Sequence, residues 1–498
     1  MINFFFRPKS ALLSALFWFS YSTGFGQVKV PRLISDGMVL QREIPIRVWG
    51  WASPGEKVTV KFGGETASGE TDDRGKWQVV LSPKKAGGPY VMDINGINHI
   101  WLKNVMVGEV WVCSGQSNME LPMERVKEKY PEIIAHSENP AIRQFKVPQK
   151  YDFNTPHDNL PGAKWESASP ETIGSFSAVA YFFAKELNEH YHVPVGLITA
   201  AVGGTPDEAW LSADALRSFP EYAAEAGRYA DSNYVNSLPA GDKKKSENLY
   251  TKPMGLYNGM IAPLTNYTIR GVIWYQGEAN VSRAKEYQTS FPALIMDWRR
   301  HWNQGVFPFL FVQLAGYGAV KDKPEESQIA ELREAQRMTL SLPKTGMAVA
   351  MDLGEWNDIH PLNKQDVGKR LALSAEHVAY DAGDMIWTGP LYHSMKIKGQ
   401  RVHLTFSEAD RGLIVKDGGE LHGFEVAGAD NRFVPAKAVI EGKNVVVVSS
   451  EAVSQPVVVR YAWADNPQGA NLYNRDILFH DGLPAPSFEA RPKEAKGK

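Results

Sequence analysis

The chain has 498 residues, of which 43% are hydrophobic and 22% are charged, and its formal net charge is −2. This composition excludes a largely disordered protein, and the length predicts two or three packed domains. The nearly balanced charge gives no indication of a nucleic-acid partner. The chain contains one cysteine, Cys113, which excludes an intramolecular disulfide, and its strand-like surroundings predict a small core residue.

Residues 1–26 have the pattern of a secretory signal peptide. Arg7 and Lys9 supply a positive start, residues 11–19 form a short apolar stretch, and small residues follow it. The stretch is shorter than the roughly 20 residues that a membrane-spanning helix needs, and no later segment is apolar enough to span a membrane. We therefore expect a periplasmic or secreted mature chain without a membrane span.

Residues 28–105 are predicted to form an N-terminal β-sandwich accessory domain. Apolar residues alternate with lysine and threonine over 57–62, which is the period of a half-buried strand. Asn95 and Gly96 form a hairpin signal, and short strands separated by turns are typical of a small sandwich. No combination of residues in this part indicates catalysis.

Strands and helices alternate over residues 106–384, which predicts a catalytic domain with a parallel sheet covered on both faces. We expect helices over 177–190 and 325–341 and a buried strand over 307–312. Residues 212–255 are rich in Ala, Asp, Lys, Ser and Asn, and we expect this segment to run over the sheet.

After residue 384 the pattern becomes β-rich again. Val402, Leu404 and Phe406 alternate with polar residues, as in a half-buried strand. Residues 385–490 are therefore predicted to form a C-terminal β-rich accessory domain, a second sandwich, which is followed by a short charged tail.

Four polar or glycine-rich segments each follow an apolar stretch that is predicted to be a buried strand. They are residues 115–119, 201–206, 274–280 and 357–361. Because the carboxyl ends of parallel strands meet at one edge of a sheet, we expect the four segments to lie together there. One such segment alone could be a polar turn that caps a helix, so the hypothesis depends on all four.

These segments contain the parts that serine acyl transfer needs. Ser117 is the candidate nucleophile, and His360 is the candidate base because an imidazole can take and return a proton near neutral pH. Asp358 would orient His360, since alternate side chains of an extended segment share a face. Asp352, Glu355 or a backbone carbonyl could take this third role instead.

The same segments closely resemble a known family, the sialate O-acetylesterase-like carbohydrate esterases of the SGNH hydrolase superfamily. The likeness is carried by Gly-Glu-Val-Trp at 108–111 with the serine segment that follows, by Leu-Tyr-Asn-Gly-Met-Ile at 256–261, and by 274–280. It extends from about Val28 to the end of the chain. It implies an SGNH-type α/β fold, a three-layer sandwich with a parallel sheet, flanked here by the two β-rich domains. It also implies removal of acetyl groups from sugar hydroxyls.

The resemblance supports Asp358 with one departure from the wider pattern. In the SGNH superfamily the carboxylate lies three residues before the histidine, and that position is Asn357 here. The string Asp-Ile-His-Pro at 358–361 nevertheless matches the narrower esterase family. Asp358 is therefore the expected orienting residue.

The tetrahedral oxyanion of acyl transfer needs preorganised hydrogen-bond donors. The backbone N–H groups of Ser117 and Gly204 are natural donors, because a glycine lets the backbone approach closely. By the family pattern the third donor is the side-chain amide of Gln276, with Asn280 near enough to compete for this role. A turn in which Gln276 and Glu278 only join loops is the alternative interpretation.

The expected substrate is an acetylated carbohydrate, and sialic acid and plant-wall polysaccharides are both compatible with the family. Aromatic faces stack on sugar rings, and we expect one or two of four aromatic residues near the site segments to line the cleft: Trp210, Trp274, Tyr275 and Trp356. We expect no cofactor, no metal and no nucleic-acid partner, and the sequence leaves the oligomeric state open.

Other classes of protein fit the sequence less well. The G-x-S-x-G elbow of a lipase fails because position 119 is Met, and no histidine pair has metal-ligand spacing. A glycoside hydrolase could use Glu278 with Asp352 or Glu355 as paired carboxylates, but Ser117 and His360 would then have no role. A non-catalytic carbohydrate-binding protein is the alternative without chemistry.

Overall fold

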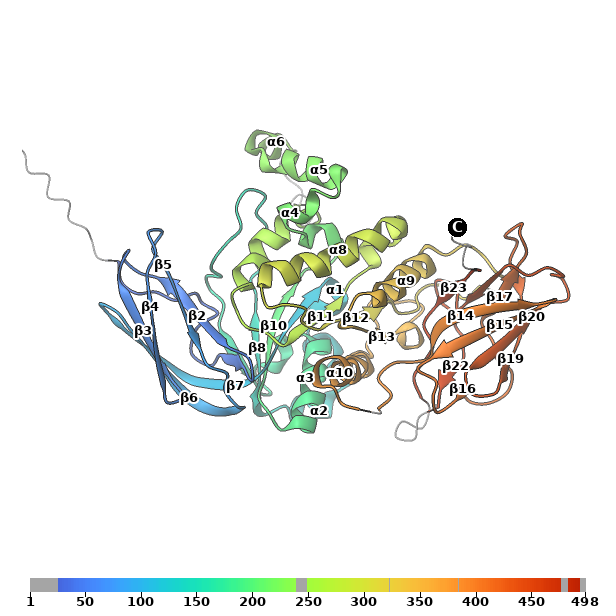
Figure 1. The fold of residues 1–498 in the computed structure, drawn as a ribbon, viewed down its shortest axis with the longest axis horizontal. Coiled ribbons are helices and arrows are strands. Elements are labelled where there is room, and N and C mark those ends of the chain that lie inside the picture. The colour runs from blue at the N-terminus through green and yellow to red at the C-terminus, as the bar shows by residue number, and fades with distance from the viewer. Residues whose placement is uncertain (1–25, 239–248, 322, 384, 476–481, 493–498) are drawn as a thin grey trace, which may run out of the picture.

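The computed structural model describes residues 26–238, 249–321, 323–383, 385–475 and 482–492. Figure 1 shows two β-rich regions on opposite sides of a central region in which helices cover a sheet. The predicted signal peptide, residues 1–26, lies outside the described residues except for its last residue. Within the described ranges, no helix combines the length and apolar character that crossing a membrane would require.

The N-terminal β-rich region contains two sheets. β2 pairs with β5 in one sheet, and β3 pairs with β4 and β6 in the other. The alternation expected over 57–62 is present, because Val58, Val60 and Phe62 are buried while the two lysines are exposed. The strands are β1 (Val39–Gln41), β2 (Ile46–Trp51), β3 (Lys57–Phe62), β4 (Glu65–Glu70), β5 (Lys76–Leu81) and β6 (Gly87–Asn95).

One long strand, β7 (His99–Gly115), belongs to both the N-terminal region and the central sheet. After the hairpin at Asn95 and Gly96, its first part pairs antiparallel with β6. Its second part pairs in parallel with β10 and β11. The domain division expected between residues 105 and 106 therefore falls within a continuous strand, and this strand leads directly to Ser117.

The central sheet has the strand order β13-β12-β11-β7-β10-β8-β9. All neighbours in this order pair in parallel except β9, which is antiparallel to β8. The predicted parallel α/β fold is thus confirmed, and the strand expected over 307–312 is β12. The bounds are β8 (Asn139–Lys146), β9 (Trp165–Ala168), β10 (Val195–Ala201), β11 (Gly271–Tyr275), β12 (Phe309–Gln313) and β13 (Thr345–Val349).

Helices cover both faces of this sheet. In Figure 1, α3 (Ala178–Tyr191) and α10 (Lys364–Tyr380) lie on one side, and α8 (Ala284–Trp302) and α9 (Gln328–Met338) lie on the other. The helices expected over 177–190 and 325–341 correspond to α3 and to α9 with its final 3₁₀ turn. The short helices are α1 (Ser117–Glu120), α2 (Pro131–Ala135), α4 (Ala213–Leu216), α5 (Pro220–Ala230) and α6 (Ser232–Ser237).

The described part of the 212–255 segment contributes α4, α5 and α6. Figure 1 shows these helices beyond α8, outside the layers that enclose the sheet. This arrangement agrees with the expectation of a segment that runs over the domain rather than through its core.

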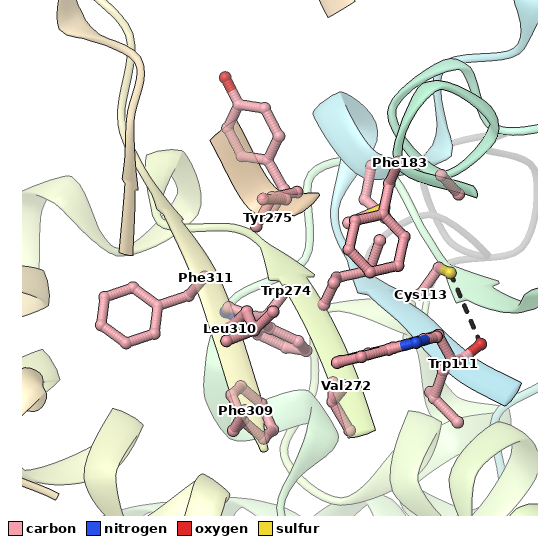
Figure 2. Close-up of a cluster of buried hydrophobic side chains, with 14 of the residues drawn as sticks. Trp111, Cys113, Phe183, Val272, Trp274, Tyr275, Phe309, Leu310 and Phe311 are labelled. Atoms are coloured by element: carbon pink, nitrogen blue, oxygen red, sulfur yellow. Dashed lines mark hydrogen bonds between the residues drawn. The ribbon is translucent and has the colours of Figure 1, made fainter. Parts of the chain in front are cut away.

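The core of the central region is built from the apolar strands β7, β11 and β12. Figure 2 shows Trp111 and Cys113 of β7 beside Val272 and Trp274 of β11, with Phe183 of α3 packed nearby. All of these residues are buried. The Cys113 thiol donates to the Trp111 carbonyl at 3.6 Å, and burial raises its pKa well above the ordinary value. Cys113 is therefore a core residue, because its reactive thiolate form is disfavoured.

The C-terminal region consists of small antiparallel sheets. The alternation expected at 402–406 is found in β15, which pairs with β14 and β20. The strands are β14 (Leu391–Lys398), β15 (Arg401–Ser407), β16 (Leu413–Val415), β17 (Phe424–Ala427), β18 (Val434–Pro435), β19 (Lys437–Glu441), β20 (Val445–Ser449), β21 (Val458–Tyr461), β22 (Leu472–Asn474) and β23 (Phe488–Ala490).

Candidate active site

Ser117 is placed by the tight exit of β7 from the sheet. Gly115 ends the strand with a φ of 135°, and a Cβ atom there would lie 2.1 Å from the carbonyl oxygen of Tyr275. Only glycine fits this close approach. Gln116 then accepts a hydrogen bond from the backbone N–H of Gly277 at 3.3 Å, which ties the serine loop to the segment after β11.

The four segments identified in the sequence meet at one edge of the sheet. In the register of the parallel strands, Gly115 lies opposite both Ala201 and Tyr275, so three of the segments leave the sheet at the same level. The fourth segment follows β13, and it returns far enough for His360 to contact Ser117. Parallel pairing therefore explains how residues so distant in sequence share one site.

Ser117 and His360 have the geometry of a nucleophile and its base. The Oγ atom of Ser117 lies 2.8 Å from Nε2 of His360, which is within hydrogen-bond distance. Burial lowers the pKa of His360; Asp358 opposes this shift, whereas Lys364 and Arg125 add to it. The lowered pKa favours the neutral imidazole, which is the form that can accept a proton from the serine hydroxyl.

Asp358 lies beside His360 but contacts it mainly through the backbone. Its Oδ1 accepts a hydrogen bond from the backbone N–H of His360 at 2.8 Å, whereas the distance from Oδ1 to Nδ1 is 3.7 Å. The second distance is an ion-pair separation rather than a hydrogen bond. Hydrogen bonds of this kind are often long in ligand-free enzymes and shorten when substrate binds.

The other two carboxylates considered for this role have different partners. Asp352 forms a two-pronged ion pair with Arg370, at 2.6 and 2.8 Å, and accepts from Tyr473 at 3.1 Å. Glu355 accepts from the backbone N–H of Leu362 at 2.8 Å, so it shapes the loop that carries the histidine. Of the three carboxylates, Asp358 is the one within ion-pair distance of the imidazole ring.

Two adjacent glycines lie against Ser117. A Cβ atom on Gly203 would be 3.4 Å from Cβ of Ser117, and the Gly203 N–H donates to Glu120 at 2.7 Å. Gly204 has a φ of 72° and open space at its Cβ position. Within the described residues, the backbone N–H groups of Ser117 and Gly204 have no hydrogen-bond partner, so both can donate to a ligand.

The amides of Gln276 and Asn280 are engaged with neighbouring loops. Gln276 is fully buried, and its Nε2 donates to the Thr205 carbonyl at 3.2 Å and to Asn280 Oδ1 at 2.6 Å. Asn280 Nδ2 donates to Asp207 at 2.8 Å and to Glu208 at 3.2 Å. In this arrangement all four amide hydrogens are in use, so either side chain must rearrange before it can donate to an oxyanion.

A buried hydrogen-bond network that the sequence does not predict lies next to Ser117. Asn118 accepts a hydrogen bond from Lys364 Nζ at 2.6 Å and donates to Glu278 at 2.5 Å. Lys364 is the first residue of α10, where a positive charge is unfavourable for a helix. A lysine at this unfavourable position, four residues after His360, is the one feature of the sequence that points to the network.

The paired-carboxylate alternative gains no support from this geometry. Glu278 contacts Asn118, and its second carboxylate oxygen is buried without a partner among the described residues. Asp352 is instead paired with Arg370. The described ranges also contain no cluster of three or more His, Cys, Asp or Glu placed to hold a metal ion.

The four aromatic residues near the site differ in exposure. Trp210, Trp274 and Tyr275 are fully buried, whereas 67% of the Trp356 surface is exposed. Trp356 lies in the loop between β13 and His360, and its carbonyl accepts from Gly318 at 2.9 Å. Trp356 is thus the one residue of the four that can present its ring to a ligand.

Comparisons with known proteins identify the family to which the chain belongs. Residues 107–376 match the family described as carbohydrate esterase, sialic acid-specific acetylesterase. The human sialate O-acetylesterase is 29% identical to this chain over 521 residues, covering 96% of this chain and 95% of the relative. The rat enzyme of the same name is 30% identical over 516 residues, and the alignment covers 92% of this chain and 93% of the relative.

The fold of the chain also matches that of a solved structure. It is described as a carbohydrate acetylesterase from Xanthomonas citri, is 41% identical, and superposes with a TM-score of 0.82. The alignment covers 93% of this chain and 99% of the other. The chain therefore belongs to the sialic acid-specific acetylesterase family of carbohydrate esterases, and it is a carboxylic ester hydrolase.

Proposed function

We propose that this esterase removes O-acetyl groups from carbohydrates through an acetyl-enzyme on Ser117. The observation that carries the proposal is the 2.8 Å contact between Ser117 Oγ and His360 Nε2 at the edge of the sheet. This contact links a poor nucleophile to a base that can activate it. The names of the curated relatives and of the matched structure support acetylated sugars as the substrate class.

In the first half-reaction, His360 takes the Ser117 proton while Oγ bonds to the acetyl carbon. The oxyanion that forms is stabilised by the backbone N–H groups of Ser117 and Gly204. Gln276 is the proposed third donor, and it would have to release Thr205 or Asn280 to act. The intermediate then breaks its bond to the sugar oxygen, which leaves with the proton from His360.

In the second half-reaction, water replaces the sugar. His360 takes a proton from this water as the water oxygen bonds to the acetyl carbon. The bond between that carbon and Ser117 Oγ then breaks, Oγ takes the proton back from His360, and acetate is released. Asp358 stabilises the imidazolium in both halves, with its Oδ1 atom 3.7 Å from Nδ1. No metal or cofactor is needed for these steps.

The exposed Trp356 is the proposed sugar contact, since aromatic rings stack on the apolar faces of sugars. We also propose that the protein acts in the periplasm or outside the cell, on the basis of residues 1–26.

Sialic acid and plant-wall polysaccharides are the two substrate groups to compare. Acetate release should be measured on acetylated sialic acids, xylan and pectin fragments with the parent enzyme and Ser117→Ala. Release by the parent enzyme alone is expected, and equal release by the variant would overturn the proposal.

A further inference from the structure

The side chain of Asn118 connects the nucleophile loop to the base loop. Asn118 directly follows the candidate nucleophile, and its Nδ2 donates at 3.0 Å to the carbonyl of Ile359, the residue before the candidate base. We propose that Asn118, held between Lys364 and Glu278, is a positioning residue that fixes the approach of the base to the nucleophile. This inference rests on the serine mechanism proposed above and extends it to side chains behind the reacting groups.

The hydrogen bonds of Asn118 fix its orientation. Its Oδ1 accepts from Lys364 Nζ at 2.6 Å, and its Nδ2 donates to Glu278 at 2.5 Å and to the Ile359 carbonyl at 3.0 Å. A lysine ammonium only donates and a backbone carbonyl only accepts, so the amide fits in one orientation. Both amide hydrogens and the oxygen of Asn118 are used. A rotation of this side chain would break its contacts to Glu278 and to the Ile359 carbonyl.

Because these contacts are buried, the loss of any one of them costs free energy. Asn118 is 1% exposed and Lys364 is 0% exposed, so water cannot replace a lost partner. The Lys364 ammonium also lies 5.4 Å from the centre of the Tyr275 ring. A buried positive charge at the start of a helix is unfavourable for folding alone. A requirement of the site explains its position better than helix stability does.

Lys364 also influences the charge of His360. Burial lowers the pKa of Lys364 to about 7, and three carboxylates oppose this shift: Glu278, Asp358 and Glu355. The groups that act on the pKa of His360 are Asp358, which raises it, and Lys364 and Arg125, which lower it in addition to burial. A protonated Lys364 therefore disfavours the imidazolium form and helps to keep the base ready to accept a proton.

The first test is Asn118→Ala in the full chain. The substitution removes the link to the Ile359 carbonyl, and a small displacement of reacting groups can cost about 10²-fold in rate. We expect kcat to fall about 10²-fold on a nitrophenyl acetate, with KM changed by no more than a few-fold. An unchanged kcat in a folded variant would overturn the proposal.

Asn474 offers a matched control away from the site. It is also buried, its Nδ2 donates to the carbonyls of Thr388 at 2.8 Å and Glu408 at 3.0 Å, and its Oδ1 accepts from Leu483 at 3.0 Å. Asn474→Ala should lower the melting temperature and leave kcat unchanged. If both variants lowered kcat equally, a general loosening of the fold would explain the effect and the proposal would fail.

A second variant, Lys364→Met, keeps the proposal testable if Asn118→Ala does not fold. Methionine has nearly the length of lysine and carries no charge, so it fills the same space. It leaves Asn118 Oδ1 without its donor, so we expect a lower melting temperature, and folding is measured alongside the kinetics. We expect a lower kcat, and we expect the acid limb of kcat/KM to move to higher pH, because a charge that opposed protonation of His360 is gone. A purely structural lysine would leave the pH profile of the folded variant unchanged, and that result would refute the proposal.

Ser117→Ala, measured in parallel, separates this inference from the proposed function. Substantial activity in Ser117→Ala would refute the serine mechanism and the positioning role with it. An inactive Ser117→Ala together with parent-like kcat and pH profiles for Asn118→Ala and Lys364→Met would refute the positioning role alone. Inactive Ser117→Ala with the expected changes in the other two supports both.

Discussion

Ser117 Oγ and His360 Nε2 lie 2.8 Å apart although 243 positions separate the two residues in the chain. The nucleophile follows β7, and the base follows β13, which lies beyond β11 and β12 in the sheet. The segment after β13 must therefore pass the ends of two strands to reach Ser117. The proposed catalytic contact depends on that loop, so residues that fix the loop are expected to affect rate as well as stability.

We expect His360→Ala to be almost inactive, because Ser117 would lose the group that takes its proton. The loss in kcat should be on the order of 10⁴ or more, as for other members of a catalytic triad. Asp358→Asn should also be severely impaired, since it removes the charge that stabilises the imidazolium. Steady-state kinetics on a nitrophenyl acetate would measure both effects.

Glu355→Gln and Asp352→Asn are the variants whose rates should be compared with the rate of Asp358→Asn. If Asp358→Asn kept near-normal rates while one of these variants lost activity, the third member would have to be reassigned. The 3.7 Å separation between Asp358 and the imidazole makes this comparison necessary.

The pH profile should reflect the lowered pKa of His360. Burial, the largest cause, disfavours the charged imidazolium, so the ring stays neutral to lower pH than the ordinary value of 6.5. Activity needs the neutral ring, and kcat/KM should therefore decline on the acid side only below that value. A decline centred clearly above pH 6.5 in the parent enzyme would contradict this account of the histidine environment.

Gln276→Ala should lower kcat by about 10²–10³ with little change in KM if the amide stabilises the oxyanion, because that contact strengthens in the transition state. Asn280→Ala is the competing variant. The same kinetic signature in Asn280→Ala alone would exchange the two roles. If neither variant lowered kcat at unchanged KM, both amides would act only by joining the loops that they contact here.

Trp356→Ala should weaken binding of an acetylated sugar and leave hydrolysis of a nitrophenyl acetate nearly unchanged. Its ring is 67% exposed and can stack on a sugar, whereas the reacting groups lie on other side chains. KM for both substrates would be compared in one preparation. Equal effects on both substrates would indicate that the tryptophan supports the loop rather than the sugar.

Short acyl esters should be preferred, with acetyl well above butyryl or octanoyl, and a chelator should leave activity unchanged. The acyl preference follows from the acetyl group as the proposed acyl unit, and the chelator result follows from acyl transfer to a serine without a metal. Nitrophenyl esters of increasing chain length, assayed with and without chelator, would measure them. A preference for long chains, or loss of activity restored by a divalent metal, would contradict the proposed chemistry.

The parallel sheet and its helices could be predicted because each element carries its own pattern. Burial on both faces gave β12 a continuous apolar run, and α3 showed helical spacing in its apolar residues. The extent of β7 could not be predicted in the same way. Its pairing changes from β6 to β10 and β11 along its length, and such partners are set by tertiary structure.

The approach of His360 to Ser117 was predictable from strand order, but the amide contacts were not. Gln276 is predicted to donate to the oxyanion, but its present donation to Thr205 and Asn280 could not be read from the sequence. The sequence places Lys364 where a positive charge is unfavourable for a helix, but it does not reveal the burial of this side chain, which depends on loops that are distant in sequence. Side-chain partners within a polar cluster are decided by packing, which a local pattern does not record.

The central claim, that Ser117 carries the acetyl group, is tested most directly by active-site labelling. The parent enzyme would be treated with a serine-directed phosphonate, digested, and analysed by peptide mass spectrometry, with His360→Ala and Ser117→Ala treated alongside. We expect one adduct, on Ser117, formed in proportion to the activity lost, much slower in His360→Ala and absent in Ser117→Ala. Inactivation with the adduct on another residue, or acetate release by Ser117→Ala at the parent rate, would contradict the account.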